Sequence, residues 1–226
     1  MPAFCSDTVA QTLSVNMEMT MQNPHRRKGR VASLLLAFAL ILSAAPTCAQ
    51  NTWDTARVWT DFEAALQRPE LVMRLDLSKS KWKSLDHRLQ RFQYLRELVL
   101  DKNKVDSLPP WLGSLTTLER LSIRSNQLRI IPPGLLELTA LKELDLSDNE
   151  IEGIPEDIDH LVSLERLLLW SNVVGHFPPS LSRLEHFVEL DLLHNEMSVE
   201  EQVWVREILP NAKLHFSAPC ECRFDD

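Results

Sequence analysis

One feature constrains the fold of this chain more than any other: a motif that recurs every 23 residues. Each copy follows the pattern L-x-x-L-x-L-x-x-N-x-φ, where φ is an apolar residue. The copies read LRELVLDKNKV, LERLSIRSNQL, LKELDLSDNEI, LERLLLWSNVV and FVELDLLHNEM, and a degraded copy, VMRLDLSKSKW, precedes them. A fixed period of this length indicates stacked units, because one unit cannot bury its apolar side chains alone. The five regular copies begin at Leu95, Leu118, Leu141, Leu164 and Phe187.

Each copy predicts a short strand followed by a turn. The two apolar residues of the central L-x-L have period two, so both point to one side of a strand. The strands are parallel because every copy runs in the same direction. The asparagine that follows lies where the chain turns away, and its amide can donate to and accept from backbone groups that a tight turn leaves unpaired. It recurs as Asn103, Asn126, Asn149, Asn172 and Asn195, with Ser80 in its place in the degraded copy.

Most copies continue with an apolar residue, a proline and two further apolar residues, as in LPPWLGSL and IPEDIDHL. The whole pattern resembles the leucine-rich repeat family, in particular its 23-residue class with the LPxxLxxL continuation, which the Ras-binding group and many small bacterial secreted proteins share. The resemblance covers Val72 to about Met197. It implies an α/β fold, a right-handed solenoid of six repeats (72–197) with a parallel sheet on its concave side.

The N-terminal end of the stack (50–71) needs a cap, because a terminal repeat otherwise exposes its apolar edge. The stretch Thr52 to Gln67 has apolar residues on one stripe at helical spacing, and Asp54 is placed to cap its start. We therefore predict one cap helix over this stretch. Three tryptophans near this end are expected to cover or fill the core: Trp53, Trp59 and Trp82.

The C-terminal end (198–226) is predicted to be a second cap. Ser198 and Glu201 form a capping-box pattern at the start of a helix that runs to Leu209, and Pro210 ends it. The stretch AKLHF that follows alternates apolar and polar residues and predicts a last strand. Trp204 is expected to cover the core from this helix.

The first 49 residues have the order of a secretory signal peptide. A basic cluster, His25 to Arg30, precedes the apolar run Val31 to Ser43, and small residues follow up to a cleavage site after Ala49. The apolar run has 13 residues, fewer than the ~20 that cross a bilayer as a helix. The alternatives are an uncleaved anchor from Val31 to Ala49, a lipid on Cys48, and a start of translation at Met17, Met19 or Met21.

Charge and chemistry exclude several classes of function. The chain has a formal net charge of −8, and the part after Ala49 carries −10 because the leader holds four Lys/Arg and two Asp/Glu. Nucleic acid is not expected as a partner, since phosphate contacts need a basic face. Membrane contact is expected only through an uncleaved anchor or a lipidated Cys48.

No catalytic motif, cofactor motif or metal site stands out in the sequence. His194 and His215 are expected near each other, but two histidines without a third ligand make a weak metal site. The tail holds Cys220 and Cys222 as C-x-C, which leaves a local disulfide, an intermolecular disulfide, a partial metal site or two idle thiols open. We therefore expect a protein that is not an enzyme.

Alternation along the strands assigns three columns of residues to the outward face of the sheet, which we call the sheet face. The first column alternates in charge along the whole stack, so each side chain has opposite charges on both sides. We interpret this column as a structural feature that avoids repulsion and fixes the register. Its members are Arg74, Glu97, Arg120, Glu143, Arg166, Glu189 and Lys213.

The second column reads Asp76, Val99, Ser122, Asp145, Leu168, Asp191 and His215, and the third reads Ser78, Asp101, Arg124, Ser147, Trp170, Leu193 and Ser217. Together they place Leu168, Trp170 and Leu193 beside one another on two adjacent strands. These three residues, the apolar patch, are the only apolar cluster on an otherwise polar face. A contiguous apolar patch is informative where a single exposed leucine is not, and tryptophan is a preferred interface anchor. Either a partner covers the patch or the tail, Ser217 to Asp226, folds back over it. The candidate partner-binding residues are Leu168, Trp170, Leu193, Arg124 and Asp101.

These observations predict an exported, non-enzymatic binding module in the periplasm, the cell envelope or the medium. It would recognise a protein or peptide on the concave face. The alternative is a structural component of the cell envelope, tethered by lipid or disulfide and without a discrete ligand. Neither the partner's identity nor the oligomeric state follows from the sequence.

Overall fold

The computed structural model describes residues 56–219, which lie within one compact unit, Asn51–Asp226. The predicted leader, Cys48, Cys220 and Cys222 fall outside these residues, so the interpretations that depend on them remain predictions. Within residues 56–219, no helix is long and apolar enough to span a bilayer.

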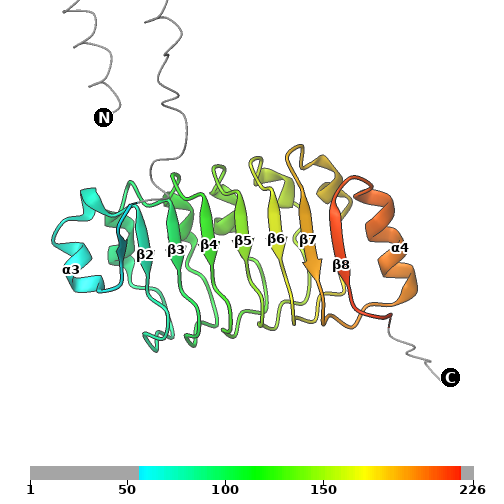
Figure 1. The fold of residues 1–226 in the computed structure, drawn as a ribbon, viewed down its shortest axis with the longest axis horizontal. Helices are drawn as coiled ribbons and strands as arrows, with labels where there is room; N and C mark the ends of the chain where they lie inside the picture. Colours follow the sequence, from blue (N-terminus) through cyan, green and yellow to red (C-terminus); the bar gives the residue numbers. More distant parts are fainter. Residues whose placement is uncertain (1–55, 220–226) are drawn as a thin grey trace, which may run out of the picture. The chain divides into compact units, whose positions relative to one another are not determined.

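The unit is built on one parallel sheet of eight strands whose spatial order is the order of the chain (Figure 1). This is the predicted solenoid with a parallel sheet, in which each repeat adds one strand beside the last. The strands are β1 (Val58–Trp59), β2 (Arg74–Asp76), β3 (Glu97–Val99), β4 (Arg120–Ser122), β5 (Glu143–Asp145), β6 (Arg166–Leu168), β7 (Glu189–Leu192) and β8 (Lys213–Phe216).

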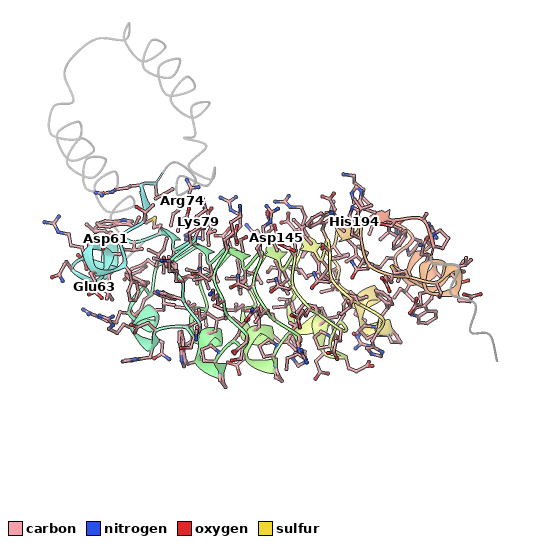
Figure 2. The ribbon with its side chains drawn as sticks, turned by 90° about the horizontal axis from the view of Figure 1, so that it is seen from below. Asp61, Glu63, Arg74, Lys79, Asp145 and His194 are labelled. Carbon is pink, nitrogen blue, oxygen red and sulfur yellow. The ribbon has the colours of Figure 1, made fainter. Side chains whose placement is uncertain are left out.

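Short 3₁₀ helices return the chain on the side opposite the sheet (Figure 2). In three of them a Pro-Pro pair marks the start, since proline fixes the backbone angle φ and needs no hydrogen-bond partner for a missing N–H. They are η2 (Pro69–Leu71), η3 (His87–Arg91), η4 (Pro110–Ser114), η5 (Pro133–Glu137), η6 (Ile158–His160) and η7 (Pro179–Arg183).

A single apolar core fills the space between the sheet and the 3₁₀ helices. The central leucine of each repeat strand points inward and is almost completely buried, which confirms the side assignment made from the L-x-L alternation. These leucines pair in register from strand to strand: Leu75, Leu98, Leu121, Leu144, Leu167 and Leu190, followed by Leu214 in β8.

The recurring asparagines form the predicted ladder beside the core. Each Oδ1 accepts a backbone N–H from the residue 21 positions earlier, at 2.9–3.1 Å. Each Nδ2 donates to the backbone carbonyl 26 positions earlier, at 2.9–3.0 Å. One side chain therefore joins two turns of the solenoid, and the residue before it takes a left-handed conformation with φ of 53–57°: Lys102, Ser125, Asp148, Ser171 and His194.

The N-terminal cap differs from the single helix predicted over Thr52 to Gln67. Val58–Trp59 forms strand β1, which pairs with β2, and only Phe62–Leu66 forms a helix, α3. Asp61, not Asp54, is the N-cap of α3, and its side chain accepts the N–H of Ala64 at 3.0 Å. The open edge of β2 explains the difference, because its unpaired backbone groups are satisfied by another strand and not by a helix.

At the C-terminal end the predicted helix and last strand are both present, but Trp204 does not cover the core as predicted, since it is 41 % exposed. Helix α4 (Val199–Ile208) begins with the Ser198–Glu201 capping box, and β8 follows it and pairs with β7. Figure 1 shows α4 covering the β8 end of the sheet. The indole of Trp204 donates to the carbonyl of Phe177 at 3.0 Å, so this tryptophan ties the cap to the last return segment.

Candidate functional site

The charged column of the sheet face has the predicted register, with each arginine opposite a glutamate. Arg74 Nε lies 2.6 Å from a Glu97 carboxylate oxygen, and Arg166 pairs with Glu143. At the last strand Glu189 accepts from Lys213 at 2.9 Å. Such partly exposed pairs contribute about 0.2–1 kcal/mol each. They are engaged with one another, which supports a structural role for this column.

A pocket of about 320 Å³ opens on the same face, toward its C-terminal half. Its walls come from four consecutive repeats, because outward residues of adjacent parallel strands lie side by side. Figure 2 shows Asp145, which lies in its wall, on the sheet side of the solenoid. We call it the Trp170 pocket, and it is lined by Arg124, Asp145, Ser147, Leu168, Trp170 and Asp191.

Trp170 keeps an exposed indole at this pocket. Its side chain lies just beyond β6 and makes an edge-on contact with His194, with ring centroids 5.4 Å apart and an interplanar angle of 78°. The residue is still 37 % exposed. Water therefore meets an apolar ring on a face that is otherwise charged or polar.

The described part of the C-terminal tail does not cover Trp170. Ser217 Oγ accepts the backbone N–H of His194 at 2.7 Å, and Gln202 donates to the carbonyl of Ser217 at 3.1 Å. These contacts hold Ser217 against the last turn while Trp170 keeps its exposure. The predicted covering of the patch by residues 220–226 lies outside the described residues.

Asp145 is a buried carboxylate in the wall of the pocket, with 9 % of the residue exposed. Its Oδ1 accepts the N–H of Ser147 at 3.0 Å, and its Oδ2 lies 3.6 Å from Nε of Arg124. Burial raises the pKa of this carboxyl, and the hydrogen bonds from Ser147 and the charge of Arg124 oppose that effect. The pocket thus holds a negative charge that is poorly solvated and only partly neutralised.

The raised pKa of Asp145 predicts a specific pH dependence of stability. An acid whose pKa is raised on folding binds more protons folded than unfolded, so stability falls as pH rises from its ordinary pKa through the raised one. We expect Asp145→Asn to be more stable than wild type at pH 7, with the difference shrinking below about pH 4, the ordinary range of an aspartate. Urea unfolding at both pH values measures it, with Asp76→Asn as the control for the amide substitution itself. A difference that does not change with pH would contradict the prediction.

The structure brings together three of the five candidate residues. Leu168, Trp170 and Arg124 line the pocket, whereas Leu193 and Asp101 do not. Asp101 is engaged with the next repeat, because its Oδ1 accepts from Ser122 Oγ at 2.6 Å and from the N–H of Arg124 at 3.0 Å. It therefore positions the backbone of Arg124 and does not face the pocket.

Sequence reasoning missed the polar residues of the pocket. Asp145 and Asp191 belong to the second outward column and flank Leu168 on either side, as the strand pairing shows. Both carboxylates stand beside Leu168 in that column, but an apolar criterion alone does not single them out. They change the character of the site from apolar to amphipathic and acidic.

The two histidines predicted near the C-terminal end have separate surroundings. His194 packs on Trp170, and Nε2 of His215 lies 2.8 Å from a Glu189 oxygen. Among residues 56–219, no group of three or more His, Cys, Asp or Glu side chains could hold a metal ion.

Comparison with known proteins identifies the repeat and the fold. Residues 116–174 match the family model "Leucine rich repeat". A leucine-rich repeat protein of Leptospira interrogans is 26 % identical, with a TM-score of 0.59, over 73 % of this chain and 49 % of that one. The comparison with curated proteins finds no match.

Two more distant structures share the fold alone. The ectodomain of the Arabidopsis thaliana receptor kinase GASSHO1/SCHENGEN3, in complex with CASPARIAN STRIP INTEGRITY FACTOR 2, is 22 % identical, with a TM-score of 0.53, over 72 % of this chain and 24 % of that one. A chain of the LRIM1/APL1C complex is 24 % identical, with a TM-score of 0.53, over 57 % and 24 %. This chain therefore spans about half or less of the length of these proteins.

Proposed function

We propose that this leucine-rich repeat protein is a binding module that holds a protein or peptide on its sheet face, with Trp170 as the anchor. The observation that carries the proposal is the exposed indole beside a pocket of about 320 Å³ on the sheet face. Aromatic anchors beside pockets supply much of the binding energy at protein interfaces.

The similar structures support the class of partner. The plant receptor ectodomain carries a bound factor, and LRIM1 and APL1C form a complex with each other. Neither likeness extends to the identity of a ligand, since fold alone does not specify function. The partner class proposed for this chain is therefore protein or peptide, without a name.

The place of action proposed for the module is outside the cytoplasm, in the cell envelope or the medium. The support is the order of basic, apolar and small residues over the first 49 positions. Sequencing the N-terminus of the mature protein tests it, and a mature chain that begins at Asn51 or later, or that retains residues 31–49, would rule out cleavage after Ala49.

Replacing Trp170 by alanine is expected to weaken binding of the native partner by about 2 kcal/mol or more, roughly thirtyfold in Kd. A pulldown from the native envelope and medium with wild type and Trp170→Ala side by side identifies the partner, and calorimetry then measures both affinities. Loss of the partner from the variant is expected because the substitution removes the exposed indole at the pocket.

Trp204→Ala is the matched control, because Trp204 is similarly exposed, at 41 %, but lies on α4 and bonds to Phe177. It should retain the partner. If wild type and Trp170→Ala retain the partner equally, Trp170 is not the anchor. A pulldown that enriches nothing in either would favour the tethered envelope component.

A further inference from the structure

The Trp170 pocket combines an exposed aromatic ring with carboxylates in its wall. We propose that it receives a cationic side chain, arginine or lysine, from the bound protein or peptide. The inference rests on the proposed function and specifies the chemistry that the pocket selects.

The charge balance of the lining favours a cation. Asp145 and Asp191 are acidic, and Arg124 is the one basic residue among the six that line the pocket. Among residues 56–219, Arg124 forms an ion pair with Asp145 alone, at 3.6 Å, and its side chain is 52 % exposed. The pocket therefore keeps a net negative charge that an incoming cation would neutralise.

Asp191 is the carboxylate best placed to bind that cation. Its Oδ1 accepts the backbone N–H of Leu193 at 3.0 Å, which orients the side chain. Within residues 56–219, no Lys, Arg or His lies within ion-pair distance of it. The other carboxylates of the neighbouring strands, Glu143 and Glu189, are already paired with Arg166 and Lys213. An incoming guanidinium or ammonium group would give Asp191 the charged partner that its neighbours have.

The apolar part of the pocket suits the stem of such a side chain. Leu168 and Trp170 provide an aliphatic and an aromatic wall, and arginine and lysine bury their methylene stems on surfaces of this kind. The face of an indole attracts a cation, and the exposed indole of Trp170 is part of the pocket lining. A neutral apolar side chain would use the walls but would leave Asp191 to be desolvated without compensation.

The alternative is that a carboxylate of the partner binds Arg124. It would then lie among Asp145, Asp191 and the ring face of Trp170, all of which oppose a negative charge. Asp145 already pairs with Arg124, so an incoming anion would compete with this carboxylate for the guanidinium group. The geometry disfavours this mode, and the experiment includes it as an outcome.

The test uses purified full chain labelled with ¹⁵N and four acetylated, amidated pentapeptides, Ala-Ala-X-Ala-Ala. X is arginine, lysine, citrulline or glutamate, and citrulline matches arginine in shape without its charge. Binding is followed by the indole N–H signal of Trp170, which Trp170→Phe identifies by its disappearance. We expect the arginine and lysine peptides to shift this signal and the citrulline peptide to bind about tenfold more weakly or less.

Asp191→Asn supplies the decisive variant, because asparagine keeps an oxygen for the Leu193 N–H and removes the charge. It should weaken the arginine peptide about tenfold and leave the citrulline peptide unchanged. Asp76→Asn is its matched control: Asp76 occupies the same column, and its Oδ1 accepts the N–H of Ser78 at 2.9 Å, outside the pocket. It should bind every peptide as wild type does.

Three results would overturn the inference: equal binding of arginine and citrulline peptides, tightest binding of the glutamate peptide, or no shift with any peptide at about 10 mM. The proposed function fails separately. If Trp170→Ala loses the native partner while peptide charge has no effect, the binding module stands and only the cation preference is wrong. If charged peptides bind but Trp170→Ala retains the partner, the proposed anchor is wrong.

Discussion

Asn172→Ala is expected to lower the free energy of unfolding by about 3 kcal/mol, a large share of the stability of an ordinary domain. The side chain is almost completely buried. Its Oδ1 accepts the N–H of Ile151 at 2.9 Å, and its Nδ2 donates to the carbonyls of Leu146 at 3.0 Å and Leu169 at 3.1 Å. Alanine leaves the Ile151 N–H buried without a partner, which costs about 1–3 kcal/mol. It also removes one of two amide donors from each carbonyl, since Leu146 keeps Asn149 and Leu169 keeps Asn195, and each lost hydrogen bond costs about 0.5–1.5 kcal/mol.

Chemical denaturation monitored by circular dichroism measures this loss, and hydrogen exchange locates it. Each repeat touches only its neighbours, so protection should fall first in the repeats around Asn172 and least at the far N-terminal end. Asn211→Ala is the matched control, because Asn211 is exposed in the segment after α4. A loss for Asn172→Ala no larger than that of the control would show that the ladder does not hold the turns together.

Gly134→Ala is expected to destabilise the chain by about 2 kcal/mol through overpacking on the side opposite the sheet. A Cβ at Gly134 would lie 2.7 Å from the carbonyl oxygen and 2.8 Å from Cα of Pro110, and both atoms belong to the backbone. No side-chain rotation relieves such a contact, so η4 and η5 must move apart. The glycine is needed for space and not for its backbone angle, since no glycine among residues 56–219 has a positive φ.

Thermal unfolding of Gly134→Ala beside Gly175→Ala separates the close approach from the general effect of adding a methyl group. A Cβ at Gly175 would meet nothing nearer than a carboxylate oxygen of Glu201 at 3.9 Å, which is ordinary contact. Gly175→Ala should therefore unfold near the wild-type temperature. Gly134→Ala should unfold several degrees lower, and equal temperatures for the two variants would contradict the close contact between η4 and η5.

Asn172→Ala and Gly134→Ala should differ in their effect on binding. Asn172 lies in the turn after Trp170, and its Nδ2 also approaches the carbonyl of Trp170, at 3.4 Å. Loss of Asn172 is therefore expected to loosen the pocket as well as the stack. Gly134 lies on the opposite side, so Gly134→Ala should lower stability while peptide binding by the remaining folded protein is preserved.

Features that depend on interactions within one repeat could be predicted from the sequence, whereas features that depend on contacts with other parts of the chain could not. The alternation of leucines and the asparagine every 23 residues predicted the strands, their register and the ladder, because each repeat imposes the same local geometry on the next. The C-terminal capping box was equally readable, since Ser198 and Glu201 bond within one helical turn. By contrast, the helix predicted from the apolar spacing of Thr52 to Gln67 was wrong, because Val58–Trp59 pairs as a strand with the edge of β2.

At the candidate site, too, one part was predictable from the sequence and another was not. The columns predicted from the sequence placed Leu168 and Trp170 together on the sheet face, and in the structure both line one pocket. They could not predict that Leu193 and Asp101 stay out of its lining while Asp145 and Asp191 enter it. Column order gives neighbours, but side-chain direction at the ends of strands depends on the hydrogen bonds of each turn, such as those that orient Asp101 toward Ser122.

The sequence by itself determined the repeat, the parallel sheet, the inward leucines and the outward tryptophan, because a period of 23 residues repeats one local solution along the chain. Only the tertiary structure decided the strand that closes the N-terminal edge, the contact of Gly134 with Pro110 and the burial of Asp145 beside Trp170. These features depend on where neighbouring turns come to rest against one another. The spacing between neighbouring turns is set by packing across repeats, so no single copy of the motif predicts it.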